Sequence, residues 1–241
     1  MVGKNASADG SVMTAHTCDG NYDARIRIIP GQTWEPGAMA PVYVNLCTDT
    51  IREPSYVGEI PQAEQTYTYF HIGYPFMNEH SVLVGEATWN GRRELRNNEA
   101  MLNIEQLTAF ALQRSTNARE FIQVAGELAE TYGYCDGGEG LTIADANDEV
   151  WLFEICGPGP FWTQGSGEPG AVWVAQRIPD DHVSVIANRA RIGEINLDDP
   201  DNFMASSNIY SVAKEFGWWD ESQPFVFHKV YNPEPYGSPA Y

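Results

Sequence analysis

The residues best suited to covalent chemistry stand close together near the start of the chain, at His16, Cys18 and Asp19. A cysteine becomes a nucleophile when its thiol loses the proton, and an imidazole can accept that proton. Side chains two positions apart in a strand point to the same face, so His16 and Cys18 can touch. This spacing raises a catalytic Cys–His pair as one hypothesis. We favour the other, a small residue at a strand end, because proximity in sequence is weak support for catalysis.

The other cysteines give no sign of a second reactive centre. The chain has four cysteines, and none of them forms the CxxC spacing of a zinc site. We therefore expect no metal, and we expect Cys47, Cys135 and Cys156 to pack as small, inert side chains. The sequence also lacks the common phosphate-binding, GxSxG and HExxH motifs.

The composition limits the partners of the chain. Fourteen basic residues against thirty-three acidic ones give a net charge of −19, spread along 241 residues. Such a surface repels nucleic acid and anionic membranes, so we expect neither as a partner. No stretch reads as a signal peptide or a membrane span, which leaves the compartment open, cytoplasmic or exported. A hydrophobic content of 43% suffices for a buried core, and we expect one domain over residues 1–241.

The reactive residues must be positioned by elements that follow the order strands, helices, strands. Alternating or β-rich runs predict strands at 24–29, 66–72, 81–88, 140–145, 149–154, 172–178 and 183–188. Helical periodicity predicts helices within 103–132, with a capped start at Asn117, and another over about 207–216. Turns at 146–148 and 179–181 join the last strands as two hairpins. The expected fold class is α+β, with antiparallel sheets and helices packed outside them.

Four segments together resemble the bacterial dipeptidase A family, whose relatives include the secernins. They are VGKNASADGSVMTAHTCDG (2–20), NEHSVLVGEATW (78–89), EGLTIADANDEVWLFEICGPGPFW (139–162) and WVAQRIPDDHVSVIANRARI (173–192). Members are N-terminal-nucleophile hydrolases, and the resemblance runs in order over nearly the whole chain. It implies an αββα sandwich, thiol-dependent hydrolysis of dipeptides, and no metal or organic cofactor.

The resemblance also implies a nucleophile that this sequence does not contain. In the family, the mature chain begins with a cysteine, in a Cys-Thr run that leads directly into the Val2-Gly3-Lys4 seen here. The α-amino group of such a cysteine, which titrates at about 8, serves as the base for its own thiol. Chains of the family are also longer. We therefore expect this sequence to be truncated at both ends and to be inactive as written.

By resemblance, three residues surround this nucleophile, namely Asp19, Asn78 and Asn188. Asp19 matches an aspartate that helps to hold the amine and the thiol, although His16 stands where related amidases carry an arginine. Asn78 and Asn188 match side-chain amides near the site, and Asn78 is the expected oxyanion donor. The alternative for Asp19 and for Asn78 is an ordinary turn residue.

Substrate contacts are expected from His16, Arg189, Arg191 and Trp162. A cation beside the site can hold the carboxylate of a dipeptide, and an aromatic ring beside Pro and Gly makes a rigid apolar wall. The alternatives are a solubilising role for the arginines and plain core packing for the tryptophan. The expected partner is a dipeptide or another small amide, and a homo-oligomer stays open.

Two rival functions remain beside a cysteine-type dipeptidase. A related amidase acting on a non-peptide substrate, such as an acyl-amino acid, would share the fold and differ in the pocket. A non-catalytic homologue or a binding subunit would account for the missing cysteine and for His16 in place of arginine.

Overall fold

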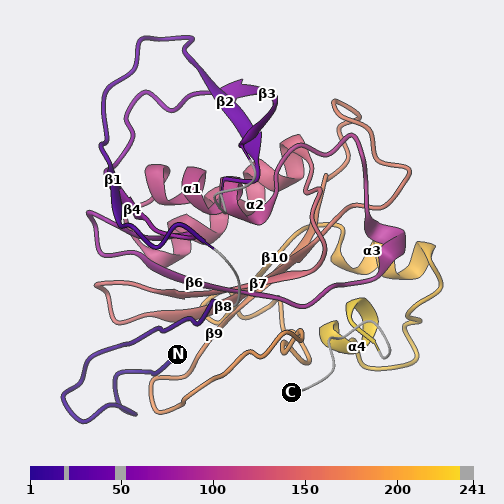
Figure 1. Ribbon diagram of the computed structural model, residues 1–241. Helices are drawn as coiled ribbons and strands as arrows, with labels where there is room; N and C mark the ends of the chain where they lie inside the picture. Colours follow the sequence, from indigo (N-terminus) through magenta and orange to yellow (C-terminus); the bar gives the residue numbers. More distant parts are fainter. Residues whose placement is uncertain (19–21, 47–52, 234–241) are drawn as a thin grey trace.

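An antiparallel sheet of eight strands forms the centre of the structure, a computed structural model that describes residues 1–18, 22–46 and 53–233 (Figure 1). Its strand order is β1-β4-β5-β6-β7-β8-β9-β10, and each neighbouring pair is antiparallel. The bounds are β1 Arg27–Ile29, β4 Tyr69–His71, β5 Pro75–Asn78, β6 Leu83–Thr88, β7 Glu139–Ala144, β8 Val150–Cys156, β9 Val172–Arg177 and β10 Phe203–Ala205. The predicted α+β class with antiparallel pairing is confirmed.

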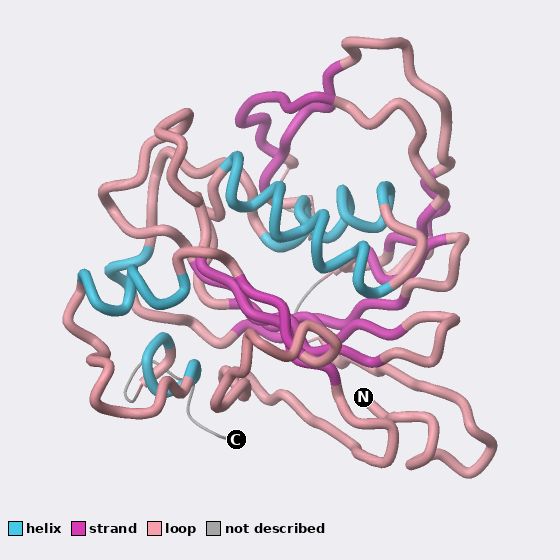
Figure 2. The backbone as a smooth tube through the Cα atoms, turned by 180° about the vertical axis from the view of Figure 1, so that it is seen from behind, coloured by secondary structure: helices cyan, strands magenta, loops and turns pink. Residues whose placement is uncertain are grey.

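Two helices, α1 (Ile104–Arg114) and α2 (Ala118–Tyr132), cover one face of this sheet (Figure 1 and Figure 2). Asn103 and Asn117 cap them, and each side chain accepts a hydrogen bond from the backbone N–H three residues further on. Such caps satisfy backbone donors that have no partner within the helix. The predicted helices and the capped start at Asn117 are confirmed.

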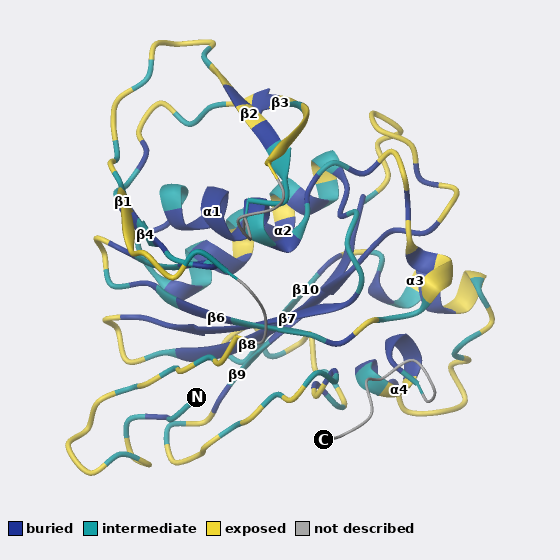
Figure 3. Ribbon diagram, in the orientation of Figure 1, coloured by how far each residue is buried: buried dark blue, intermediate teal, exposed yellow. Residues whose placement is uncertain are grey.

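The other face of the sheet is covered by residues 1–18 and 183–192 and by two short helices, α3 (Ile209–Glu215) and α4 (Phe227–Tyr231). A 3₁₀ turn, η1 (Arg93–Leu95), lies on the connection from β6 to α1. Every residue of β8 is buried, because its alternate side chains join the core beneath α1 and α2 and the core on the opposite face. Figure 3 shows this burial through the centre of the sheet. None of the helices in the described part of the chain is long and apolar enough to cross a membrane.

A two-stranded hairpin that the sequence does not predict stands apart from the main sheet. It consists of β2 (Met39–Val44) and β3 (Ser55–Pro61), which pair antiparallel. Proline is depleted in strands, and Pro36 and Pro41 fall beside and within this segment. Pro41 is nevertheless a strand residue, and it is exposed at the edge of this small sheet, where a missing N–H costs little.

The prediction that residues 172–178 and 183–188 form one hairpin is wrong. β9 pairs with β8 along one edge and with β10 along the other, so both of its edges are occupied. After Pro179 the chain leaves the sheet, and Val183 forms a bridge with Val2. The predicted strand therefore belongs to the layer that covers the sheet, and its partner is the beginning of the chain.

The first residues of the chain are held against the turn at 179–182 by close backbone contact. Gly3 donates a hydrogen bond to the carbonyl of His182 (2.9 Å), and Asn5 donates one to the carbonyl of Asp180 (2.8 Å). A Cβ atom on Gly3 would lie 2.4 Å from that Asp180 oxygen, a distance that no side chain tolerates. Val2 also bridges to Met13, so the chain start lies between two antiparallel neighbours.

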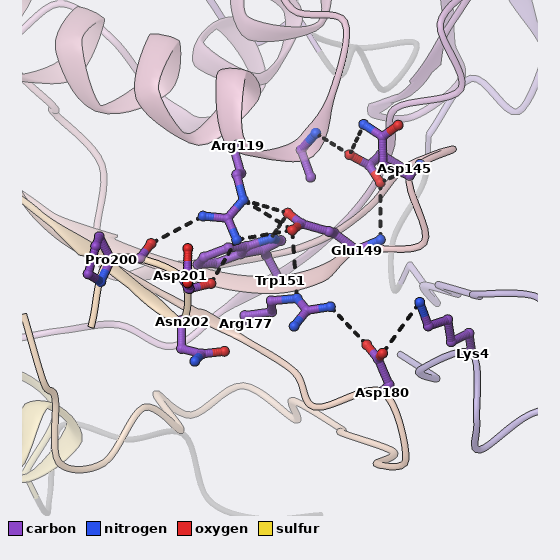
Figure 4. Close-up of polar contacts among 12 residues, drawn as sticks. Lys4, Arg119, Asp145, Glu149, Trp151, Arg177, Asp180, Pro200, Asp201 and Asn202 are labelled. Atoms are coloured by element: carbon purple, nitrogen blue, oxygen red, sulfur yellow. Dashed lines mark hydrogen bonds and ion pairs between the residues drawn. The ribbon is translucent and has the colours of Figure 1, made fainter.

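A row of ion pairs extends this anchor across the sheet (Figure 4). Lys4 pairs with Asp180 (3.4 Å), and Asp180 pairs with Arg177 (2.9 Å). Arg177 approaches Glu149 at 3.8 Å, and Glu149 also receives the guanidinium of Arg119, at the start of α2, at 2.8 Å. Through this row, Lys4 near the start of the chain is linked to β9 of the sheet and to α2 of the helix layer.

Replacing Gly3 with alanine tests the close contact. We expect Gly3→Ala to lower the free energy of unfolding by about 1–3 kcal/mol, because the new methyl group forces the segment away from the turn. Gly193→Ala is the control, since a Cβ there meets no atom within 4 Å. Urea denaturation of both variants gives the two values. Equal stability of the two variants would contradict the proposed contact.

Candidate active site

A cavity of about 460 Å³ opens beside the first residue of the chain. Its walls come from residues 15–18, from residues 184–188 and from residues 86–88 at the end of β6, together with Met1, Tyr22, Tyr74 and Thr142. Cavities of this size hold small molecules in other proteins. The structure thus brings the chain start, the His16–Cys18 segment and the Asn188 segment around one space.

Asn188 is held in this wall by backbone conformation and by a hydrogen bond. Its φ of 52° lies in the left-handed region, which asparagine tolerates better than most residues. Its side-chain amide donates to the carbonyl oxygen of Thr88 at 2.8 Å. The end of β6 therefore fixes the amide at the cavity.

The amino group of Met1 lies in the same cavity and is partly withdrawn from water. It donates a hydrogen bond to the carbonyl of Ser184 at 2.9 Å, and burial lowers the pKa of this amine from its usual 8.0. An amine with a lowered pKa is more often neutral at pH 7, which is the form that accepts a proton.

His16 faces a carboxylate and an aromatic ring. Its Nε2 lies 4.0 Å from Oε2 of Glu86, and its ring meets Tyr74 edge to face at 5.7 Å between centroids. His16 packs closely against the backbone of Gly85, where a Cβ atom would come within 2.9 Å of the His16 Cβ. Asp19 lies outside the described residues, so its position relative to His16 is not part of this site.

Asn78 lies elsewhere, inside the fold. The residue is fully buried, and its amide donates to the carbonyls of Leu112 (2.9 Å) and Ser115 (2.8 Å) at the end of α1. Its side-chain oxygen accepts from the backbone N–H groups of His80 and Val82. Both amide hydrogens are thus engaged in joining β5 to α1, and Asn78 is not among the described residues that line the cavity.

Arg189, Arg191 and Trp162 are also not among the described lining residues. Arg191 is exposed, and its backbone N–H donates to the buried carboxyl of Glu154 at 2.5 Å. The Trp162 ring is only 6% exposed and packs near Gly133, while its indole N–H binds the carbonyl of Glu168. The aromatic wall expected from Trp162 therefore lies at the end of α2.

The remaining cysteines differ in exposure. Cys18 is exposed at the cavity, Cys135 is half-buried, and Cys156 is buried. Burial raises the pKa of Cys135 to about 12 and that of Cys156 further, so both thiols stay protonated at neutral pH. Cys47 lies outside the described residues. No group of three His, Cys, Asp or Glu side chains in the described ranges could hold a metal ion.

A second hollow, of about 620 Å³, lies between the β2–β3 hairpin and α1. It is lined in part by His71, whose pKa burial lowers to about 4, so this imidazole is neutral. None of the residues nominated from the sequence lines it. Size alone therefore does not make it the better candidate.

Comparison with known proteins identifies the family of the chain. The sequence model of peptidase family C69 matches residues 1–241. The chain belongs to peptidase family C69. This C69 chain is 29% identical to a probable dipeptidase of Latilactobacillus sakei, over 87% of its own length and 42% of that protein.

Two further relatives extend this comparison of the C69 chain. A probable dipeptidase of Salmonella dublin is 26% identical, over 96% of the chain and 52% of the relative. Dipeptidase A of Lactobacillus helveticus is 25% identical, over 90% of the chain and 45% of the relative. The chain thus spans about half the length of the curated relatives it matches.

Glu86 is the cavity residue that sequence reasoning missed. The sequence shows it only as a single glutamate in a predicted strand, whereas in the structure its side chain is 10% exposed and lines the cavity. The reason lies in how the strands pair. β5 pairs with β6 only at Met77 and Leu83, whereas β7 pairs with β6 along its whole length, from Leu83 to Thr88. Which strands pair beside Glu86 is a tertiary property of the C69 chain, so the sequence pattern around Glu86 does not reveal it.

Asn78→Ala separates a structural role from a chemical one. We expect the free energy of unfolding to fall by on the order of 3 kcal/mol, because two buried carbonyls and the buried N–H group of Val82 lose their partner. Asn98→Ala, at an exposed position, is the control. Urea denaturation measures both. Unchanged stability of Asn78→Ala would contradict this role and return Asn78 to the list of candidate donors.

Glu154 makes stability depend on pH. Burial raises the pKa of this carboxyl to about 8 in the folded chain, against 4.5 as its ordinary value. The folded form keeps a proton that the unfolded form loses, so this contribution is full below pH 4.5 and is lost as the pH rises to about 8. We expect Glu154→Gln to make the fall in unfolding free energy from pH 5 to pH 8 shallower, by a few kcal/mol at roughly 1.4 kcal/mol per pKa unit. Denaturation of wild type, Glu154→Gln and the exposed-site control Glu59→Gln at three pH values measures it, and parallel slopes for all three would refute it.

Proposed function

We propose that this C69 chain carries the N-terminal part of a cysteine-type dipeptidase site, which cleaves the amide bond of a dipeptide through a thioester. Family membership supports a peptidase, and the relatives named dipeptidase support the substrate class. The nucleophile would be an N-terminal cysteine placed ahead of Val2-Gly3-Lys4. The alternative amidase and non-catalytic functions are decided by the experiment below.

The geometry of the chain start is the observation that carries this proposal. Val2 bridges antiparallel to Met13 on one side and to Val183 on the other, and Met1 and Ser184 exchange two hydrogen bonds. A strand continued ahead of Met1 in the same register would run between residues 14–18 and 184–188. These are the segments that line the cavity. A cysteine two residues before Val2 would thus lie opposite Val185, in the same wall of the cavity as Asn188.

The chemistry follows from the properties of an N-terminal cysteine. Its α-amine takes the proton of its thiol, and the thiolate attacks the amide carbonyl of the dipeptide. The protonated amine then gives that proton to the leaving amine as the C–N bond breaks, which leaves a thioester. Water, deprotonated by the same amine, hydrolyses the thioester and regenerates the thiol.

Asn188 is the proposed oxyanion donor from the described residues. Its amide is held at the cavity by Thr88. A fixed neutral donor of this kind typically lowers the activation barrier by a few kcal/mol. Asp19 stays a proposed neighbour of the nucleophile on the basis of the family resemblance. Asn78 contributes by joining β5 to α1, as its buried hydrogen bonds indicate.

The test compares the chain as printed with a chain that begins Cys-Thr ahead of the same residues and includes the downstream half found in the relatives. We expect no release of amino acids from a dipeptide panel by the printed chain, because the thioether of Met1 is not a nucleophile. We expect turnover by the extended chain, at least a hundredfold loss on Asn188→Ala, in line with the usual effect of an oxyanion donor, and complete loss after alkylation of the terminal thiol.

Other outcomes select the rivals. Turnover by the printed chain that disappears in Cys18→Ala would replace the N-terminal nucleophile with Cys18. Cleavage of acyl-amino acids without cleavage of dipeptides would favour the related amidase. Inactivity of the extended, folded chain on both substrate classes would favour the non-catalytic function.

A further inference from the structure

The charge of the candidate active-site cavity is unusual for a site that must accept a zwitterion. Among the described lining residues, Glu86 is the single Asp, Glu, Lys or Arg side chain. The other formal charge is the α-amino group of Met1, which would be an uncharged peptide nitrogen in a chain extended ahead of it. The described wall therefore attracts a cation and offers no fixed cation to a carboxylate.

Contacts within the wall hold the Glu86 carboxylate in place. Thr88 Oγ1 donates to its Oε1 at 3.2 Å, and the carbonyl of the same Thr88 accepts the amide of Asn188. His16 Nε2 lies 4.0 Å from Oε2, which is too long for a hydrogen bond and leaves room for another donor there. Thr88 thus hydrogen-bonds both to the carboxylate and to the proposed oxyanion donor.

A second carboxyl, that of Glu139, neighbours Glu86 and is not among the described residues that line the cavity. Glu139 of β7 is 3% exposed, stands opposite Thr88 in the β6–β7 pairing and hydrogen-bonds to Glu86. Its Oε2 is buried and has no hydrogen-bond partner. Burial first, and then the neighbouring Glu86, raise the pKa of Glu139 well above 4.5, which favours the neutral form of Glu139 beside Glu86. Of the two carboxyls, Glu86 is the one that lines the cavity.

We infer that Glu86 binds the free α-ammonium group of the substrate, so that the cavity selects unblocked dipeptides over N-acylated ones. This inference rests on the proposed function and identifies the free α-ammonium group as the feature of the substrate that the site recognises. In a dipeptide the ammonium is attached to the carbon next to the scissile carbonyl. A carboxylate fixed beside the oxyanion donor is therefore in the correct neighbourhood to bind it. Glu139 is a positioning residue that orients Glu86.

The experiment measures binding to the printed chain by calorimetry, with Ala-Ala, N-acetyl-Ala-Ala and Ala-Ala amide as probes. We expect Ala-Ala and its amide to bind roughly tenfold more tightly than the acetylated peptide, the effect of one charge-assisted hydrogen bond. Glu86→Gln should remove this preference by weakening only the two probes that carry an ammonium. Glu59→Gln, at an exposed position on β3, is the matched control and should keep it.

The role of Glu139 is tested by comparing two substitutions. Glu139→Met removes the hydrogen bond to Glu86 and should reduce the ammonium preference severalfold. Glu139→Gln keeps a donor at this position and should restore most of it, which a purely structural role would not explain. Thermal unfolding of each variant confirms that it is folded.

Three results would overturn the inference. They are equal binding of acetylated and free peptides by the wild type, no measurable binding of Ala-Ala, and an equal loss for all probes in Glu86→Gln. Hydrolysis by the extended chain is scored separately. Absence of hydrolysis with an intact ammonium preference would sink only the dipeptidase proposal, whereas equal cleavage of free and acetylated dipeptides would sink only this one.

Discussion

The backbone of Gly3 lies directly against the turn that contains Asp180, and the geometry of the candidate site depends on this contact. It fixes Val2 between Met13 and Val183, and it places the α-amino group of Met1 at the cavity. The Asn188 segment follows the same turn, so its position is set by the same anchor. Lys4, Asp180 and Arg177 add ion pairs to this contact but cannot replace the close approach that a residue without a side chain permits.

Buried carboxyls in this strongly acidic chain are accommodated in three different ways. Asp145 accepts hydrogen bonds from the backbone N–H groups of Ala118, Asn147 and Glu149, so it ties α2 to the β7–β8 turn (Figure 4). Glu154 accepts from two N–H groups of the covering layer. Glu139 instead hydrogen-bonds to another carboxyl. The first arrangement suits a permanent charge, whereas the last suits a shared proton, and the last is the one beside the cavity.

Local signals allowed part of this structure to be predicted from the sequence. The cap at Asn117 and the β7–β8 hairpin depend on residues near one another in the chain, and they were predicted correctly in kind. The partner of residues 183–188 and the role of Asn78 depend on contacts across more than thirty residues. The resemblance nominated His16 and Asn188, but only the fold could show that they share a cavity while Asn78 joins two elements elsewhere.

The contact between Met1 and Ser184 joins residues 183 positions apart, and this separation has a consequence for biosynthesis. A ribosome adds roughly 5–20 residues per second, so the first residue waits on the order of ten seconds or more before its partner has been made. During that interval the segment around Met1 lacks the docking surface that residues 179–188 provide. The wall formed by residues 184–188 is therefore the last part of the cavity to be synthesised, after every other lining residue that the structure describes.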